Sequence, residues 1–355
     1  MARQAHTRPQ TLAMATHERE ITEPVDLCDP TGRTLNPDAR GWSRHPHLRA
    51  NLDGRWGRTK RWDYWAVLAG DLVIAATYAD VDYLGMATVW WCDLSTGATG
   101  GVDANVPFAR GLELPERYGT TPLRFSDRRI SMDIVDGERG TLIDARWTEQ
   151  DGRRSHLHVE VGLPPDHENL HVVIPWSDRT FQYTAKHQAR PAHGTLAIGP
   201  MVHGIGDDGD AWGVLDVGRG RWPYRTNWNW GGGAGRAEDG AVVGIQIGAK
   251  WTEGTGFTEN GITVDGRLEK IGAELQWEYS WEQPMLPWRV RHPDGSLDLT
   301  LRTRYDRHTK VAAVLMGMEV HQVFGHWSGH VTGTDGRRHE VSGLQGFAEE
   351  CRARW

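Results

Sequence analysis

Long hydrophobic runs are missing from this sequence, and their absence excludes a helical membrane span. No window approaches the roughly 18 consecutive apolar residues that a transmembrane helix requires. Apolar residues make up 38% and charged residues 25% of the chain, which is a normal balance for a soluble protein. The first 20 residues also lack an apolar segment and a cleavage-site pattern. We therefore predict a disordered leader at residues 1–19, a cytoplasmic location and no integral membrane segment.

Cysteine is scarce, and positive charge is not in excess. The three cysteines, Cys28, Cys92 and Cys351, are far apart and form no CxxC pair, which argues against zinc binding or thiol redox chemistry through cysteine. The formal net charge is -7, and the lysines and arginines are scattered along the chain. Because nucleic acids bind to clustered basic residues, no nucleic-acid partner is expected.

Helical patterns and common catalytic motifs are missing as well. No segment has the period of a long amphipathic helix, which disfavours a parallel α/β sheet. No GxSxG nucleophile motif occurs. The stretch WGGGAG at residues 230–235 lacks both the strand-then-helix frame and the GKS or GKT ending of a phosphate-binding loop. We therefore predict no cofactor.

Two signals that are abundant indicate antiparallel β-structure. Apolar and polar residues alternate in many short runs, as in HLHVEV at residues 156–161, where one face carries Leu157, Val159 and Val161. The dipeptide Asp-Gly occurs eight times, and between alternating runs it is a strong hairpin signal because both turn residues can adopt positive φ. The number of expected strands is larger than one open twisted sheet comfortably holds. We therefore predict an all-β chain with two barrels or sandwiches. The polar stretch 187–200, which contains two prolines, suggests domains at residues 20–190 and 191–355.

Tryptophan is unusually frequent, with 18 residues, and four of them lie in the stretch 212–235 around Asp216. Asp216 directly follows Val214 and Leu215, where a buried charge requires a cation or hydrogen-bond donors. One interpretation is a structural clamp with Arg219, Arg221 or Arg225. The other is a pocket acid whose pKa is raised by apolar walls.

Aromatic and polar residues from several segments are candidates to line one pocket. They come from RWDYW at 61–65, DVDYLG at 80–85, PWSDRTFQYTAKHQ at 175–188 and the tryptophan-rich stretch. Flat aromatic faces can either fill a core or line a ligand site. The predicted ligand-binding residues are Trp62, Asp63, Tyr64, Tyr83, Tyr183, Lys186, Trp222, Trp228 and Trp230.

The 17 histidines are the obvious place to look for a metal site. His156 and His158 lie two residues apart on one strand face, which is the spacing of a β-sheet metal site, and His171 is a candidate third ligand. Their strand alternates cleanly, so we interpret that face as solvent-exposed. The group His321, His326 and His330 is ambiguous. We predict no metal.

Several motifs together resemble one bacterial family along the whole chain. The segments RWDYW, PWSDRTFQYTAKH, DVGRGRWPYRTNWNWGGG and TENGITVDG resemble the domain-of-unknown-function family 2804. The chain is more distantly similar to carotenoid hydratases, AttH-like proteins and tandem-lipocalin cyclases, in which an aspartate precedes a tryptophan and a W-x-W element. Asp216, Trp222, Trp228 and Trp230 match that order. The resemblance implies two lipocalin-like antiparallel β-barrels of the tandem calycin type.

An aspartate among tryptophans suits the protonation of an apolar molecule in a dry site. We therefore expect a cofactor-free acid-catalysed hydratase, isomerase or cyclase that acts on a lipophilic small molecule, either isoprenoid or polyketide-like. In this hypothesis Asp216 is the acid, Arg219 tunes it and Tyr224 donates a hydrogen bond. The alternative is a non-catalytic, lipocalin-like carrier in which Asp216 is structural. Whether Asp216 faces a cavity or an arginine cluster distinguishes the two.

Overall fold

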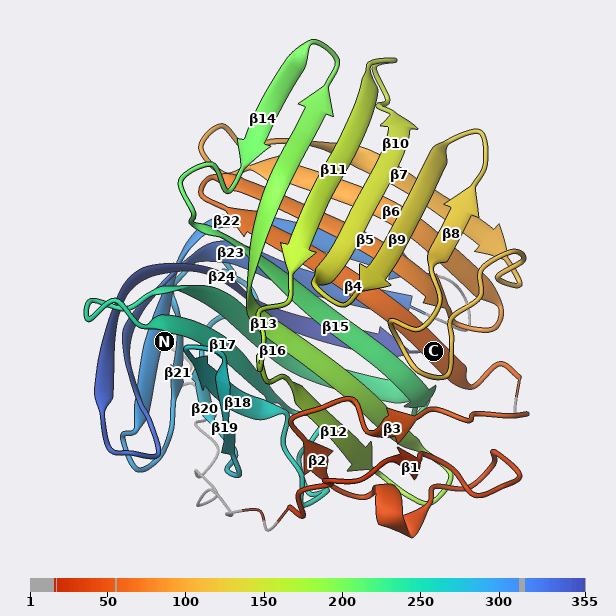
Figure 1. Cartoon of the computed structure of the whole chain (residues 1–355), viewed down its shortest axis with the longest axis vertical. Coiled ribbons are helices and arrows are strands. Elements are labelled where there is room, and N and C mark those ends of the chain that lie inside the picture. Colours follow the sequence, from red (N-terminus) through yellow and green to blue (C-terminus); the bar gives the residue numbers. More distant parts are fainter. Residues whose placement is uncertain (1–15, 17, 55, 313–316, 355) are drawn as a thin grey trace, which may run out of the picture.

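The chain is almost entirely β-structure in the computed structural model, which describes residues 16, 18–54, 56–312 and 317–354 (Figure 1). Within this part of the chain the sole helix is a short 3-10 turn at Pro37–Ala39. No helix in the described ranges is long and apolar enough to cross a membrane. The prediction of an all-β fold is confirmed, and the chain forms two large, curled antiparallel sheets (Figure 1).

The first unit is a sheet of 13 strands in the described residues, and it folds over so that β8–β11 cover β4–β7 (Figure 1). Its main path runs β7-β6-β5-β4-β15-β13-β11-β10-β9-β8; the short strands β12 and β14 pair with β13, and β2 pairs with β12. The strands are β2 (Trp42–Ser43), β4 (Thr59–Ala69), β5 (Leu72–Asp80), β6 (Leu84–Asp93), β7 (Ala98–Pro107), β8 (Leu123–Ser126), β9 (Ile130–Gly137), β10 (Gly140–Thr148), β11 (Arg154–Gly162), β12 (Leu170–Pro175), β13 (Phe181–Ile198), β14 (Met201–Ile205) and β15 (Ala211–Arg221).

The second unit is a curled antiparallel sheet of nine strands in the described residues, in the order β19-β18-β17-β16-β24-β23-β22-β21-β20. A separate two-stranded parallel pair, β1 (Val25–Asp26) with β3 (Leu48–Arg49), lies near the start of the chain. The strands of the second sheet are β16 (Arg225–Arg236), β17 (Val242–Ala249), β18 (Asn260–Val264), β19 (Arg267–Ile271), β20 (Gln276–Glu278), β21 (Trp288–Arg291), β22 (Leu297–Ala312), β23 (Gly317–Thr332) and β24 (Arg338–Arg354).

The Asp-Gly signals mark real turns. Between β18 and β19, Asp265 has a φ of 47° and Gly266 a φ of 79°, so this two-residue hairpin has positive φ at both central positions. Gly137 is the exception among the eight glycines, because it lies inside the paired end of β9 and does not have positive φ. Local turn chemistry therefore accounts for most of the strand connections that the sequence predicts.

Strand β13 connects the layers of the first sheet. Its beginning pairs with β12 and β15, its end pairs with β11 and β14, and its register with β15 shifts between His187 and Arg190. A bulge of this kind bends a strand and lets it pass from one layer to another. The predicted domain boundary at residues 190 and 191 lies inside β13, whereas the chain passes between the two sheets after Arg221. A division at that boundary stays a prediction.

Of the predicted leader at residues 1–19, only Thr16, Glu18 and Arg19 are among the described residues. The backbone N–H of Thr16 donates to the carbonyl oxygen of Gly272 at 2.7 Å. The carboxylate of Glu18 lies 2.9 Å from the Nζ atom of Lys270. The described part of the leader therefore contacts the second sheet.

Alternation along the central strands divides the core. Trp65 of β4 and Leu215 of β15 face the apolar interior between the two layers of the first sheet. On the opposite side of the same strands, Ala66 and Val214 pack with Phe347 of the second sheet. Strands β4, β13 and β15 therefore have one face in the core of the first sheet and the other at the junction with the second. That junction contains the candidate site.

Candidate functional site

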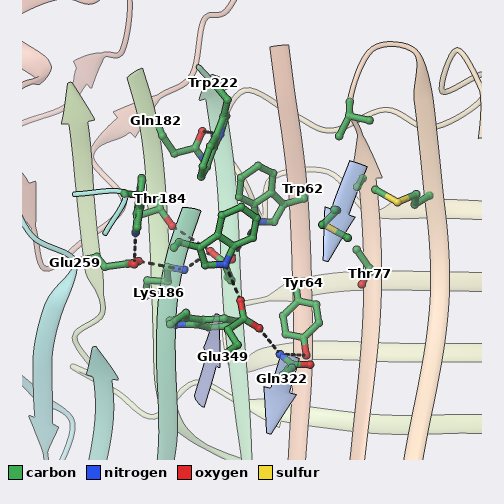
Figure 2. A pocket seen from close by; sticks show the side chains of 18 residues that line it. Trp62, Tyr64, Thr77, Gln182, Thr184, Lys186, Trp222, Glu259, Gln322 and Glu349 are labelled. Carbon is green, nitrogen blue, oxygen red and sulfur yellow. Dashed lines mark hydrogen bonds and ion pairs between the residues drawn. The ribbon is translucent and has the colours of Figure 1, made fainter. Parts of the chain in front are cut away.

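A cavity of about 240 Å³ lies at the junction of the two sheets (Figure 2). Its walls come from β4, β5, β6, β13 and β15 of the first sheet and from β16, β23 and β24 of the second, together with the loops after β5, β15 and β17. The lining is mostly aromatic and apolar, with a few polar groups. The residues that line it are Trp62, Tyr64, Thr77, Ala79, Val81, Met86, Gln182, Thr184, Lys186, Asp216, Trp222, Trp228, Trp230, Trp251, Glu259, Met318, Gln322 and Glu349.

Strand register brings the polar residues of the first sheet into one row. Lys186 of β13 is paired with Asp216 of β15, which is in turn paired with Tyr64 of β4. Residues directly opposite each other in antiparallel strands share a face, so all three side chains point into the junction. Gly218, two residues after Asp216, is needed there because a Cβ atom would lie 2.1 Å from the Trp62 ring. This glycine makes room for Trp62 in the cavity wall.

A buried lysine sits between two carboxylates at one end of the cavity. The Nζ atom of Lys186 is 2.9 Å from Oδ1 of Asp216 and 3.3 Å from Oε2 of Glu259. Burial lowers the pKa of Lys186, but the two carboxylates outweigh this effect, and the pKa is raised above its ordinary value. The ammonium also lies 4.2 Å from the centre of the Trp230 ring. Lys186 is therefore held as a fixed cation.

Asp216 is fully engaged by donors from the first sheet. Its Oδ2 accepts a hydrogen bond from the indole N–H of Trp62 at 3.1 Å, and its Oδ1 accepts one from the hydroxyl of Thr184 at 3.1 Å in addition to the lysine. The Oε1 atom of Glu259 accepts from the indole N–H of Trp251 at 2.5 Å. Burial raises the pKa of Glu259, and Lys186 lowers it only in part.

A third carboxyl group, that of Glu349, faces the cavity from the second sheet (Figure 2). Its Oε1 accepts from the indole N–H of Trp228 at 2.8 Å, and its Oε2 accepts from the side-chain amide of Gln322 at 2.9 Å. The same amide nitrogen lies 3.4 Å from the Tyr64 hydroxyl. Burial raises the pKa of Glu349 to about 7, against the lowering effects of the Trp228 hydrogen bond and of Lys186. This carboxyl group titrates near neutral pH.

Tryptophans form a cluster beside the polar groups. Trp222 stacks on Trp251 with ring centroids 5.5 Å apart and planes 15° apart. Its ring is also 5.8 Å from Trp62 and 5.7 Å from Trp228. The indole N–H of Trp222 donates to Oε1 of Gln182 at 2.8 Å. The cluster thus presents flat apolar faces to the cavity while its polar atoms are used in the walls.

The cavity includes seven of the residues singled out from the sequence: Trp62, Tyr64, Lys186, Asp216, Trp222, Trp228 and Trp230. It also contains functional candidates that sequence reasoning missed. Glu259 lies in the motif TENGITVDG, so that motif carried a signal for it. No sequence signal pointed to Glu349, because it is followed by Glu350 in a run without clear alternation. Thr77, Gln182, Thr184, Gln322 and Trp251 complete the missed polar and aromatic lining.

Arg219 and Asp63 are not brought to the cavity. An odd separation along β15 places Arg219 on the opposite face from Asp216. There its Nη2 atom lies 2.7 Å from Oδ1 of Asp63, and its Nη1 donates to the carbonyl oxygen of Trp62 at 2.7 Å. The arginine that was expected to tune Asp216 is therefore paired with a different aspartate.

The three other tyrosines of the predicted site also lie outside the cavity lining. Tyr183 is buried on the core face of β13, where its hydroxyl is 3.1 Å from Nδ1 of His171. Tyr83 lies under the ammonium of Lys60, which is 4.2 Å from its ring centre. Tyr224 is 39% exposed in the connection between β15 and β16. Strand alternation explains the first case, and loop position explains the other two.

The fold and the cavity define an antiparallel all-β protein with a tryptophan-lined, acid-containing site between two curled sheets. The chain belongs to the family described as "Domain of unknown function (DUF2804)", which matches residues 18–355. The resemblance noted from the sequence is thereby confirmed. Comparison with curated proteins finds no match.

Solved structures that are similar to this chain at low sequence identity were also found. They are kievitone hydratase from Nectria haematococca (11% identity, TM-score 0.46, covering 84% of this chain and 89% of that one), CghA with Sch210972 (11%, 0.43, 96% and 98%), and a protein described as an AttH from Nitrosomonas europaea (14%, 0.41, 82% and 92%). They include an AttH, a name that the sequence resemblance had also suggested.

Proposed function

We propose that the protein is a cofactor-free acid-catalysed hydratase, isomerase or cyclase acting on a lipophilic small molecule, either isoprenoid or polyketide-like. The observation that most supports this proposal is Glu349, a buried carboxyl group with a pKa of about 7 in the wall of a tryptophan-lined cavity. An acid whose pKa lies near the working pH is partly protonated and transfers its proton effectively. A site shielded from water strengthens that transfer.

Glu349 is the proton donor in this proposal. Its proton adds to one carbon of a carbon–carbon double bond, whose electron pair forms the new C–H bond, and the neighbouring carbon becomes a carbocation. In a hydratase, water adds to this cation and then returns a proton to the Glu349 carboxylate. In an isomerase or a cyclase, the cation rearranges or closes a ring before it loses a proton to the same carboxylate. The faces of Trp222 and Trp228 stabilise the positive charge.

Asp216 has a supporting role in this scheme, although the sequence suggested it as the acid. It is the partner of Lys186, and its two oxygens already accept hydrogen bonds from Trp62 and Thr184. Together with Glu259, it fixes the lysine at one end of the cavity. That charged end would orient a polar group of the substrate, while the apolar part lies among the tryptophans.

A non-catalytic carrier is the second candidate, and the tryptophan side chains favour it. Each ring that lines the cavity is fixed by a hydrogen bond from its indole N–H, as Trp230 is by Oε1 of Gln246 at 3.0 Å. A rigid, preformed pocket of this kind binds apolar ligands without chemistry. In either case the partner is a small molecule. The cytoplasmic location and the absence of a nucleic-acid partner remain predictions.

The two candidates are separated by deuterium transfer from solvent. The purified protein would be incubated in D2O with a panel of unsaturated isoprenoid and polyketide-like compounds, returned to H2O and analysed by mass spectrometry. An acid catalyst leaves carbon-bound deuterium in a product that is hydrated, isomerised or cyclised. We expect this product with the wild type and at least about 100-fold less with Glu349→Gln, the usual contribution of one general acid.

The matched control is Glu340→Gln, which removes an exposed carboxylate from the same strand, β24, outside the cavity. It should convert the same compounds at the wild-type rate. Binding is followed separately by quenching of tryptophan fluorescence. Compounds that quench the wild type and Glu349→Gln equally, with no conversion by either protein, would identify a carrier and contradict the catalytic proposal.

A further inference from the structure

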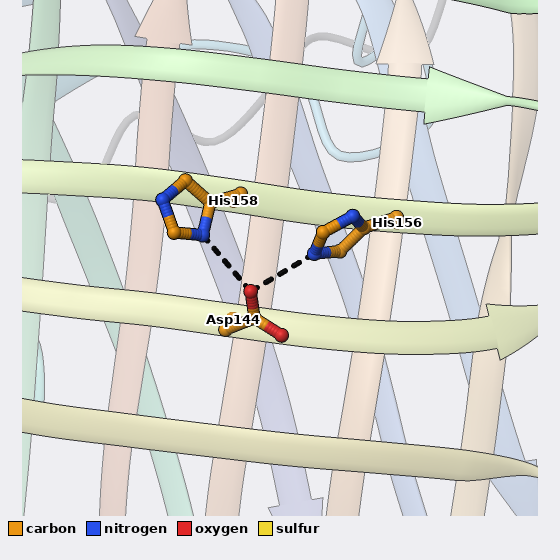
Figure 3. A group of neighbouring side chains, drawn as sticks. All are labelled: Asp144, His156 and His158. Carbon is orange, nitrogen blue, oxygen red and sulfur yellow. Dashed lines mark hydrogen bonds and ion pairs between the residues drawn. The ribbon is translucent and has the colours of Figure 1, made fainter.

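A second group of converging side chains lies on the outer face of the first sheet, away from the cavity (Figure 3). It consists of Asp144 on β10 and of His156 and His158 on β11. The sequence suggested His171 as a third ligand for the two histidines, but His171 is buried against Tyr183 inside the sheet. Asp144 takes that place instead. It comes from the neighbouring strand, so spacing along one strand could not reveal it.

The three side chains point at one another. Both Nε2 of His156 and Nδ1 of His158 lie 2.9 Å from Oδ2 of Asp144 (Figure 3). The three ligand atoms are all within 4.8 Å of one another. Ligand atoms at about 2.0–2.2 Å from a tetrahedral zinc ion are roughly 3.3 Å apart. Small side-chain rotations would therefore admit an ion between these groups.

Strand geometry explains why the ligands meet. Asp144 is the direct cross-strand partner of His158, and His156 lies two residues away on the same face. On the opposite face Ile143 and Leu157 are fully buried in the core, which fixes the strands against rotation. The strand face that carries Asp144, His156 and His158 is therefore rigid.

The surroundings of Asp144 prepare it as a ligand. Its other oxygen, Oδ1, lies 2.6 Å from Nη1 of Arg146, and Nη2 of the same guanidinium donates to Oδ2 at the longer distance of 3.4 Å. Metal-binding carboxylates are commonly oriented by such an outer partner.

We propose that Asp144, His156 and His158 form a binding site for a divalent transition-metal ion of the zinc class on the outer face of the first sheet. Two imidazoles and one carboxylate suit zinc and disfavour magnesium and calcium, which prefer oxygen ligands. The three protein ligands leave a fourth position open to water or to a group from another molecule. A bound ion crosslinks β10 to β11 and stabilises the folded chain by mass action.

Another histidine group has a less suitable geometry. His308 and His321 stack face to face, with ring centroids 4.2 Å apart and planes 4° apart, beside Glu319. A metal binds in the plane of an imidazole ring, and parallel stacked rings do not direct their nitrogens at a common point. Zinc binding by this group would require the rings to separate. It therefore provides a matched control.

The test is a calorimetric titration of the full-length, tag-free protein with Zn²⁺ alone near pH 7.5. We expect one ion per chain, no comparable binding of Mg²⁺, and loss of the zinc site in His158→Ala. Asp144→Asn should weaken zinc binding at least about 10-fold. The double variant His308→Ala with His321→Ala should bind zinc as the wild type does.

The melting temperature without metal shows whether His158→Ala is folded, and its increase with zinc is a second readout. The wild type and the His308/His321 variant should be stabilised by zinc, whereas His158→Ala should not. The proposal would be overturned if the wild type did not bind zinc, or if zinc still bound to both His158→Ala and Asp144→Asn. Loss of zinc binding in the variant without His308 and His321 would overturn it as well.

Discussion

Two acids face the same cavity from opposite sheets, and their partners differ. Asp216 is paired with a cation, because Nζ of Lys186 lies 2.9 Å from its Oδ1. Glu349 accepts hydrogen bonds from two neutral donors, the indole of Trp228 and the amide of Gln322, and its pKa rises to about 7. The comparison shows that two carboxyl groups that both accept a hydrogen bond from a tryptophan have different electrostatic surroundings. A cation beside a carboxylate favours its charged form and opposes the effect of burial, whereas the two neutral donors of Glu349 leave burial as the larger effect.

A third carboxylate extends this comparison to the other face of β15. One interpretation of the sequence was an ion pair between an arginine and Asp216. In the structure Arg219 instead pairs with Asp63, with 2.7 Å between Nη2 and Oδ1. Both residues are buried. The same strand therefore places an arginine–aspartate pair in the core of the first sheet and a lysine–aspartate pair at the cavity.

Removing the cation should have the largest effect. Lys186→Met keeps the length of the side chain but leaves Asp216 and Glu259 buried without their shared partner. We expect the free energy of unfolding at pH 8 to fall by about 3–5 kcal/mol, measured by urea denaturation. Lys310→Met removes a lysine from an exposed ion pair with Glu319 and should change it by less than about 1 kcal/mol. An equal decrease in the free energy of unfolding in the two variants would mean that the buried ion pair contributes no more to stability than the exposed one.

The raised pKa of Glu349 predicts how stability depends on pH. Its pKa is about 7 in the folded protein against an ordinary value of 4.5, so the folded state holds this proton more tightly. The stabilisation is present in full below pH 4.5 and is lost as the pH rises to about 7, a change of about 3 kcal/mol. Glu349→Gln should lack this component. Glu274, whose pKa is also raised to about 7, is present in both proteins and cancels in the difference. Parallel stability curves between pH 4.5 and 7 would contradict the assignment.

A smaller effect is expected when Asp216 is changed, and it tests which acid reacts. Asp216→Asn keeps the shape and leaves Lys186 paired with Glu259, so unfolding should become easier by about 1–2 kcal/mol. Turnover of a compound identified by the deuterium experiment should fall less than in Glu349→Gln. A loss of about 100-fold in Asp216→Asn with near-normal turnover in Glu349→Gln would return the acid role to Asp216.

The fold was more predictable from the sequence than the site. Alternation in residues 156–161 and the turn at Asp265 and Gly266 depend on neighbouring residues, so each signal is complete within a short segment. The cavity instead depends on pairing between distant strands. The hydrogen bond between Trp228 and Glu349 joins residues 121 positions apart, and nothing in either segment indicates the other. Alternation along a strand at residues 211–221 places Arg219, three residues after Asp216, on the opposite face, so the sequence alone argues against a contact between these two side chains.

The smallest expected effect comes from Tyr224, which the sequence suggested as a hydrogen-bond donor in the site. It lies between Trp222 and Trp228 in sequence, yet its side chain is 39% exposed and does not line the cavity. Phenylalanine retains the ring that faces the Arg58 guanidinium at 6.0 Å, so Tyr224→Phe should change the free energy of unfolding by no more than about 0.5 kcal/mol. Its turnover should stay within about two-fold of the wild type, because a hydroxyl outside the cavity cannot contact the reacting atoms.

Tyr64→Phe is the matched comparison, since it removes a hydroxyl that lines the cavity near Gln322. Rates and urea midpoints of both variants would be measured side by side. If Tyr224→Phe lost about 10-fold in turnover while Tyr64→Phe did not, the polar contacts of the site would have to extend into the connection between the two sheets.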